Sequence, residues 1–179
     1  MFKYLIQDLK WALGYLPYGV FAAGLFFVFF SARNVSRMKQ GKEPQPIMAS
    51  VGFYTYLLII FCLTLLSREQ GSTSKIDLEI GSTLRINVRN NAYVVENILL
   101  FIPYGFCLAW RFGCRNKWLM NIVIGMATTL TVEYTQLITG RGVFQIDDIL
   151  TNVAGCILGL LCCRLYTFIK EKKTRVYLR

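Results

Sequence analysis

The chain has 179 residues, of which 55% are hydrophobic and 17% charged, and its mean hydropathy is +0.45. The apolar residues form blocks long enough to cross a bilayer core, which takes about 20 helical residues, so this composition excludes an ordinary soluble domain whose helices carry a polar face. The formal net charge is +10, but the basic residues flank the apolar blocks. We therefore expect membrane lipids as partners and no nucleic acid.

Cysteine and histidine usage narrows the chemistry that the chain can perform. All the cysteines except Cys114 lie inside apolar blocks, which favours small packing residues over a disulfide framework. The chain contains no histidine, which excludes histidine-based zinc sites and a Ser-His-Asp triad. We expect no cofactor.

The apolar blocks predict an all-α integral membrane protein. The first block contains several glycines and a proline, but it is long and no cleavage-site pair of small residues follows it, so we expect a retained helix and not a secretory signal. Five transmembrane helices are predicted, over residues 11–32, 47–66, 93–112, 118–139 and 148–169.

The longest polar segment, between the second and third predicted spans, has the alternation of a β-strand. Apolar side chains recur at every second residue on both sides of a Gly81-Ser82-Thr83 turn, which predicts a β-hairpin over residues 75–89. Because an isolated hairpin is marginal in water, we expect its apolar face to be packed. That face carries Ile76, Leu78, Ile80, Leu84, Ile86 and Val88.

The distribution of basic residues predicts the topology. Five spans place the N-terminus, the hairpin and the loop at 140–145 on one side, with seven of the twenty lysines and arginines. The other thirteen lie on the opposite side, and cytoplasmic loops hold the excess. We expect the N-terminus outside and the C-terminus in the cytoplasm.

The fourth predicted span carries polar side chains on one face. Thr129, Glu133 and Gln136 are spaced i, i+4 and i+7. Ionisable groups within spans mark candidate functional sites because hydrocarbon solvates them poorly. Glu133 would lie about 9 Å below the helix end, so it needs either a proton or a cation, for which Arg141 is the nearest candidate. Alternatively, such a pair only locks two helices together.

The fifth predicted span opens with two acids and continues as a polar-to-small stripe. Asp148, Asn152, Gly155 and Gly159 share one face, and the two glycines permit close approach of another helix. Asp147 is explained by capping the helix N-terminus, where the dipole favours negative charge. An acid aligned with Asn152 is less easily explained by capping. We therefore expect Asp148 to belong to a site.

The third predicted span contributes two further features. Pro103 deprives the carbonyl of Leu99 of its helical donor and should kink the helix. Asn97 lies near the outer end of the same helix. Freed backbone and an amide side chain could serve a ligand there, although a kink that only aids packing is the alternative.

A combined pattern covers about residues 97–159. It consists of Asn97 with the segment LFIPYGF, EYTQ at 133–136, Arg141, Asp147-Asp148, Asn152 and GCILG at 155–159. This pattern resembles the VanZ-like family of bacterial integral membrane proteins. The name-giving member of that family is associated with teicoplanin resistance by a route that does not remake the peptidoglycan precursor. The resemblance implies no firm biochemical activity.

We expect one outward-open cleft between the last two helices. Its predicted lining is Glu133, Gln136, Arg141, Asp148 and Asn152, with Asn97 on its wall. We also count Asp147, next to Asp148, among the candidate binding residues. The favoured function is a membrane factor that binds a ligand at the outer face, such as a lipid-linked cell-wall precursor or a glycopeptide, and lowers glycopeptide action.

Three alternatives stay open. The first is an intramembrane enzyme acting on a lipid or lipid-linked headgroup, with Glu133 or Asp148 as general acid or base and Arg141 binding an anionic group. Transport is weaker, because no internal repeat is evident. A Mg²⁺ or Ca²⁺ ion bound by Asp147, Asp148 and Glu133 is chemically possible, but we predict no metal.

Overall fold

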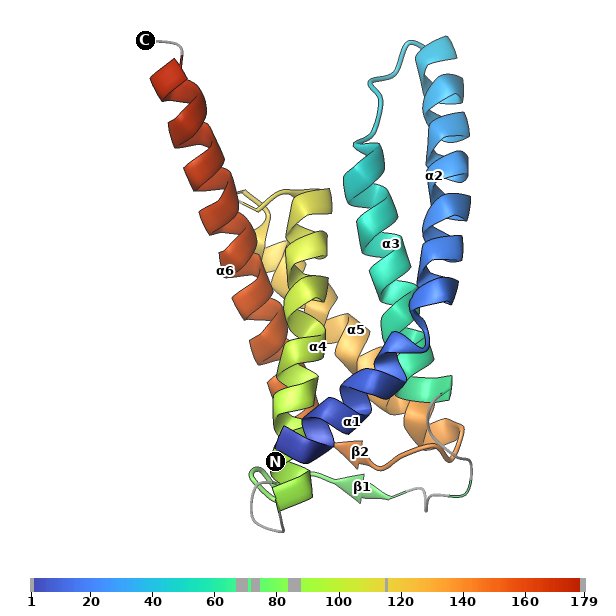
Figure 1. Ribbon diagram of the computed structural model, residues 1–179, viewed down its shortest axis with the longest axis vertical. Coiled ribbons are helices and arrows are strands. Elements are labelled where there is room, and N and C mark those ends of the chain that lie inside the picture. The colour runs from blue at the N-terminus through green and yellow to red at the C-terminus, as the bar shows by residue number, and fades with distance from the viewer. Residues whose placement is uncertain (1, 67–70, 72–74, 84–87, 115, 178–179) are drawn as a thin grey trace.

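The computed structural model describes residues 2–66, 71, 75–83, 88–114 and 116–177. Most of them are helical, and Figure 1 shows α1 and both short strands at one end of the helical body and the C-terminus at the other. The elements are α1 (Phe2–Leu13), α2 (Leu16–Lys39), α3 (Ile47–Phe61) with the π-helical turn η1 (Cys62–Leu66), β1 (Ile76–Asp77), α4 (Val88–Phe112), α5 (Trp118–Ile138), β2 (Phe144–Gln145) and α6 (Ile146–Tyr177).

Four helices of the described chain are long and apolar enough to cross a membrane. They are α2, α3 with η1, α4 and α6. Helix α5 has 21 residues, which is sufficient length, but Asn121, Glu133 and Gln136 lower its hydropathy. Four of the five predicted spans therefore correspond to helices that could cross a membrane, and the fifth span, at α5, stays a prediction.

The first predicted span does not begin where the sequence suggested. Residues 11–13 end a separate helix, α1, and the chain turns at Gly14 and Tyr15 before α2 starts. Pro17 lies in the first turn of α2, where its missing N–H costs no hydrogen bond. The proline thus begins a helix here and is not an interruption within one.

The other predicted spans match the helices more closely. Residues 47–66 coincide with α3 and η1, and α5 ends one residue before the predicted boundary. Helix α6 extends from the predicted 148–169 to Tyr177. The basic tail continues as helix because lysine and glutamate are good helix formers in water.

The predicted β-hairpin is wrong in its pairing. β1 pairs in parallel with β2, so that Ile76 lies opposite Phe144 and Asp77 opposite Gln145. Residues 84–87, most of the second predicted strand, lie outside the described residues, and Val88 opens α4. The expectation that the apolar face of this segment is packed is also wrong for its first half, because Ile76, Leu78 and Ile80 are all more than 60% exposed.

The backbones of α4 and α6 meet at glycines. A Cβ atom on Gly155 would overlap the carbonyl of Ile98, and one on Gly159 would overlap the carbonyl of Ile102. Gly105 of α4 lies equally close to the carbonyl of Cys156. The predicted close approach at the glycine stripe therefore occurs, and its partner is α4.

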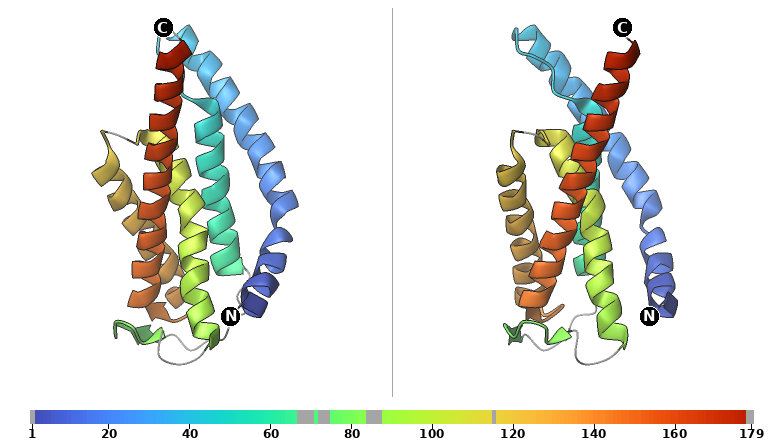
Figure 2. Two further views of the ribbon diagram at one scale, coloured as in Figure 1. Left: turned by 60° about the vertical axis from the view of Figure 1, so that its left-hand side comes forward. Right: turned by 90° about the vertical axis from the view of Figure 1, so that its left-hand side faces the viewer.

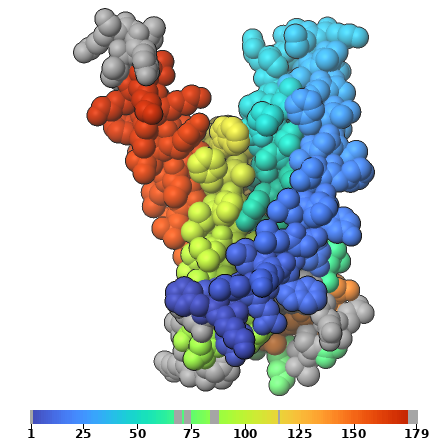
Figure 3. Space-filling view, viewed as in Figure 1, coloured from blue at the N-terminus to red at the C-terminus, as the bar shows by residue number. Residues whose placement is uncertain are grey.

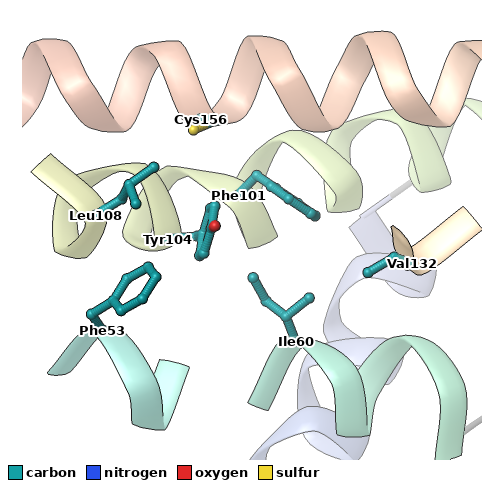
Figure 4. Packing of buried hydrophobic residues seen from close by; sticks show 7 residues of the cluster. All are labelled: Phe53, Ile60, Phe101, Tyr104, Leu108, Val132 and Cys156. Atoms are coloured by element: carbon teal, nitrogen blue, oxygen red, sulfur yellow. The ribbon is translucent and has the colours of Figure 1, made fainter. Parts of the chain in front are cut away.

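The central core joins α3, α4, α5 and α6. Figure 4 shows its members, with the rings of Phe101 and Tyr104 opposite residues of α3. By contrast, α2 rests on α3, through contacts such as the stacked Phe30 and Tyr54 rings, whose centroids are 5.3 Å apart. The buried cluster consists of Phe53, Ile60, Phe101, Tyr104, Leu108, Val132 and Cys156.

Candidate functional site

The polar face of α5 is buried within the protein. Thr129, Glu133 and Gln136 are at most 2% exposed. Figure 2 shows α5 running beside the lower part of α6, and α5 contacts both α6 and α4. The i, i+4, i+7 spacing read from the sequence therefore corresponds to an interior stripe.

The polar start of α6 is buried as well, and one hydrogen bond joins the two stripes. Asp147, Asp148 and Asn152 are at most 7% exposed. The Nδ2 atom of Asn152 donates to the hydroxyl of Thr129 at 2.8 Å. The Oδ1 atom of Asn152 has no hydrogen-bond partner in the described structure. A buried amide oxygen without a donor is costly and marks a position where a donor would be stabilised.

Glu133 lies one helical turn above Thr129 and reaches the start of α6. Its Oε2 atom accepts a hydrogen bond from the backbone N–H of Gln145 at 3.3 Å. Gln145 is the residue immediately before α6. The structure thus brings Glu133 to the junction where Asp147 and Asp148 begin the next helix.

Gln136 and Arg141 are directed to a different element. Gln136 Nε2 donates to the carbonyl of Thr64 at 3.0 Å, and Arg141 Nη1 donates to the carbonyl of Leu65 at 2.8 Å. Both acceptors belong to η1, whose last carbonyls lack partners within the helix. These side chains therefore close the end of α3, a role that spacing along α5 did not reveal.

Asp147 binds the polar loop between α3 and α4. Its two carboxylate oxygens accept hydrogen bonds from the backbone N–H groups of Gly81 at 2.8 Å and Thr83 at 3.0 Å. Gly81 has φ +82°, a left-handed conformation that glycine adopts without strain. Asp147 thus fixes this loop across the end of α5 and α6, and it also lies in the first turn of α6, where the sequence predicts a capping role.

A second aspartate organises the same loop. Asp77 accepts from the hydroxyl of Ser82 at 2.7 Å and from the backbone N–H of Glu79 at 3.0 Å. These two hydrogen bonds, first that from Ser82, lower the pKa of the Asp77 carboxyl below its usual range. Together with the pairing of β1 and β2, they hold residues 75–83 as a small cover at this end of the molecule.

Asn97 remains apart from the hydrogen bonds described above. It is half-buried on α4. Its neighbour Ile98 touches Gly155, one turn below Asn152. Asn97 therefore lies at the level of the polar stripe, on a neighbouring helix.

Sequence reasoning missed several polar residues that position these elements. Asn121 is fully buried and donates from Nδ2 to the carbonyl of Gly113 at 2.9 Å, which fixes the turn between α4 and α5. Tyr56 donates to the carbonyl of Leu100 at 2.9 Å, beside the carbonyl that Pro103 frees. An asparagine inside an apolar block is a signal that could have identified Asn121, whereas nothing in the local sequence indicates the Tyr56 contact.

The described carboxylates do not assemble a metal site. Within the residues that the structure describes, no three acidic or cysteine side chains converge in a metal-binding arrangement. Both oxygens of Asp147, one of the three suggested ligands, are already directed at backbone N–H groups. The alternative of a Mg²⁺ or Ca²⁺ site therefore gains no support from this geometry.

Comparison with known proteins gives the chain a family. Protein VanZ of Enterococcus faecium is 33% identical over 67 residues, which cover 37% of this chain and 41% of that protein. The match therefore spans about two-fifths of the length of this relative. No solved structure matches the chain. The VanZ/LLP1 family model matches residues 53–168, well over half of the sequence, and extends from α3 to α6, so the chain belongs to the VanZ/LLP1 family.

Proposed function

We propose that this VanZ-family protein acts at the outer face of the bacterial cytoplasmic membrane and lowers susceptibility to glycopeptide antibiotics such as teicoplanin. The observation that carries the proposal is the buried polar stripe between α5 and α6, where Glu133, Asp148 and Asn152 lie at most 5% exposed. Burying ionisable groups within membrane-spanning segments is energetically unfavourable, so such groups indicate a functional site. The family supplies the antibiotic context.

The proposal includes five spans, with α5 as the fifth. Asn121, Thr129, Glu133 and Gln136 of α5 are buried, whereas most of the exposed side chains of this helix are apolar, in keeping with contact to lipid. The N-terminus is then outside and the C-terminus inside, in keeping with the basic-residue asymmetry. The outward side chains are Leu119, Val123, Met126, Leu130, Tyr134 and Ile138.

In this proposal the ligand site is a cleft at the outer ends of α5 and α6. Glu133 and Asp148 supply its charge, and the unpartnered oxygen of Asn152 accepts a hydrogen bond from the ligand. Asn97 lies on its wall. Residues Gln136, Arg141 and Asp147 border it and also hold η1 and the 75–83 loop in place.

A susceptibility assay tests the proposal. Glu133→Gln keeps an oxygen that can accept from Gln145 but removes the charge, so it should fold normally and lose activity. Tyr134→Phe is the matched control, because Tyr134 is 59% exposed and points about 100° around the helix from Glu133. Expression of the wild-type chain and the control in a teicoplanin-susceptible Gram-positive host should raise the inhibitory concentration, whereas Glu133→Gln should not.

Folded protein must be measured in the same cells, for example by size-exclusion chromatography of a fluorescent fusion. The proposed site is refuted if the loss of resistance in Glu133→Gln merely follows a loss of folded protein. The proposed function is refuted if the wild-type chain leaves susceptibility to every glycopeptide unchanged.

Two buried carboxyl side chains on facing helices also suit general acid–base catalysis. The second candidate is therefore an enzyme that acts on a lipid or lipid-linked headgroup, with Glu133 or Asp148 transferring the proton. Arg141 would bind an anionic group through its guanidinium. Mass spectrometry of lipids and cell-wall precursors, with wild type and Glu133→Gln, separates the two functions: an altered headgroup that requires Glu133 indicates an enzyme.

A further inference from the structure

The N-terminal helix α1 has three distinct faces. One face contacts the bundle through half-buried residues that include Tyr4 and Asp8. A second face carries the exposed polar residues Lys3, Gln7 and Lys10, spaced i, i+4 and i+7. The third face is entirely apolar.

The apolar face of α1 is uncovered by any described part of the chain. Its residues are spaced i, i+4, i+7 and i+11, so they form one continuous row. Figure 3 shows α1 lying on the surface, near the end that carries the polar loop. The row consists of Phe2, Ile6, Leu9 and Leu13, which are 74%, 55%, 61% and 53% exposed.

One arginine of α4 contacts the bundle-facing side of α1. The Arg89 guanidinium lies 3.9 Å from Asp8 Oδ2 and 5.0 Å from the ring centre of Tyr4. Arg89 also donates from Nε to the hydroxyl of Tyr93 at 2.7 Å. Because these contacts occupy the Asp8 face, the apolar row is held away from the bundle.

We propose that α1 is an interfacial helix that inserts its Phe2, Ile6, Leu9 and Leu13 row into the lipid surface at the outer ends of the membrane-spanning helices. With 12 residues it extends about 18 Å, too short to cross a bilayer core of about 30 Å. Lys3 and Lys10 flank the row at the depth of lipid phosphates. This inference does not depend on the proposed resistance function.

Two observations favour lipid over a second copy of the chain: exposed apolar residues continue from α1 into α2, and Lys3 and Lys10 lie beside the apolar row. Helix α2 starts three residues after α1 and is a candidate span, with Leu16, Val20 and Phe21 more than 50% exposed. Exposed apolar side chains therefore continue along the chain from Leu13, the last residue of the row, to Leu16 at the start of α2. A Trp at position 11 and a Tyr at position 18, both 71% exposed, are side chains that membrane interfaces favour.

Spin-label depth measurements on the full chain test the proposal. Single cysteines replace Ile6, Leu9 or Gln7 in a chain whose own cysteines are changed to alanine or serine. The labelled proteins are placed in phosphatidylcholine–phosphatidylglycerol liposomes. Power saturation then compares collisions with oxygen, which partitions into lipid, and with a water-soluble nickel chelate. The positions chosen are exposed, so labelling should leave the fold intact, which size-exclusion chromatography verifies.

Labels at Ile6 and Leu9 should collide mainly with oxygen, and the order should reverse at Gln7, one face away on the same helix. The proposal is overturned if nickel reaches Ile6 and Leu9 as readily as Gln7. It is equally overturned if full labelling at Ile6 or Leu9 gives dipolar broadening that dilution with unlabelled protein removes, since a second copy would then cover the row.

Discussion

The Asn152 amide is the clearest case in which a single side chain connects two helices. Its Nδ2 bonds to Thr129, and its Oδ1 is left without a donor. Hydrogen bonds between helices within membranes contribute about 0.6 kcal/mol on average and about 1.7 at most. This modest value indicates that the asparagine is not explained by stability alone.

A double-mutant cycle measures this bond. We expect Thr129→Val and Asn152→Leu each to destabilise the protein, with a coupling free energy of about 0.6–1.7 kcal/mol. The double variant should be less destabilised than the sum of the single changes, because no half-satisfied group remains. Unfolding by dodecyl sulfate in mixed micelles supplies the free energies. Strict additivity would mean that the bond does not form.

The Asp77 carboxyl predicts a pH dependence of the 75–83 loop. Its pKa is lowered in the folded loop by Ser82 and the Glu79 N–H, so the stabilisation is complete above the unfolded pKa, near 3.9. It is lost as the pH falls through the lowered folded value. The carboxyl carbon of Asp77, followed by NMR, should titrate below the normal range in the wild type and closer to it in Ser82→Ala. Identical titration in both proteins would contradict this assignment.

Among the secondary-structure elements, the packing of α4 against α6 depends most strongly on glycine, because a side chain at the contact would collide with the facing backbone. Gly155→Ala would drive a methyl group into the carbonyl of Ile98, and overpacking of this kind costs about 1–3 kcal/mol. Gly24 on α2 has no atom within 4 Å of the added Cβ, so Gly24→Ala should be neutral or stabilise by up to about 1 kcal/mol. Thermal unfolding in detergent compares the two. Equal effects would mean that α4 and α6 are not in contact at Gly155.

Local sequence patterns predicted helices better than they predicted pairing. Apolar block length identified α3, α4, α5 and α6, because the bilayer core sets a minimum span. Strand alternation located β1 but not its partner, since pairing depends on the tertiary position of Phe144 and on the Gly81 and Thr83 amides that Asp147 binds. No periodicity within residues 75–89 contains that information.

At the scale of the whole molecule, the structure separates the two ends of the chain along the long axis (Figure 1). If α5 crosses the membrane, α1 and the C-terminus lie on opposite sides. Cysteines placed at Lys3 and Lys173 in a cysteine-free chain should then differ in labelling. An impermeant maleimide should reach position 3 in intact cells and position 173 only after permeabilisation. Labelling of both positions from the same side would remove α5 from the spans.

Side chains of the predicted site share two buried helix faces, and some of them also hold neighbouring elements in place; the sequence indicated the shared faces but not the contacts to neighbouring elements. Helical spacing placed Glu133 with Thr129, and Asp148 with Asn152, on buried faces. The same reasoning could not assign Gln136 and Arg141 to η1, because a side chain's partner on another helix depends on how the helices pack. Polar residues in apolar blocks thus locate a site, and the fold decides which of them bind backbone.

The π-helical turn at Cys62–Leu66 has a consequence for insertions and deletions. A π turn accommodates one more residue than the α-helix around it, so it can be regarded as a single inserted residue that α3 absorbed without unwinding. Deleting one residue there would restore regular helix and rotate the following carbonyls by about 100°. Gln136 and Arg141 would then lose their acceptors at Thr64 and Leu65 together. A length change of one residue in α3 would thus break contacts at the C-terminal end of α5, beside the polar stripe.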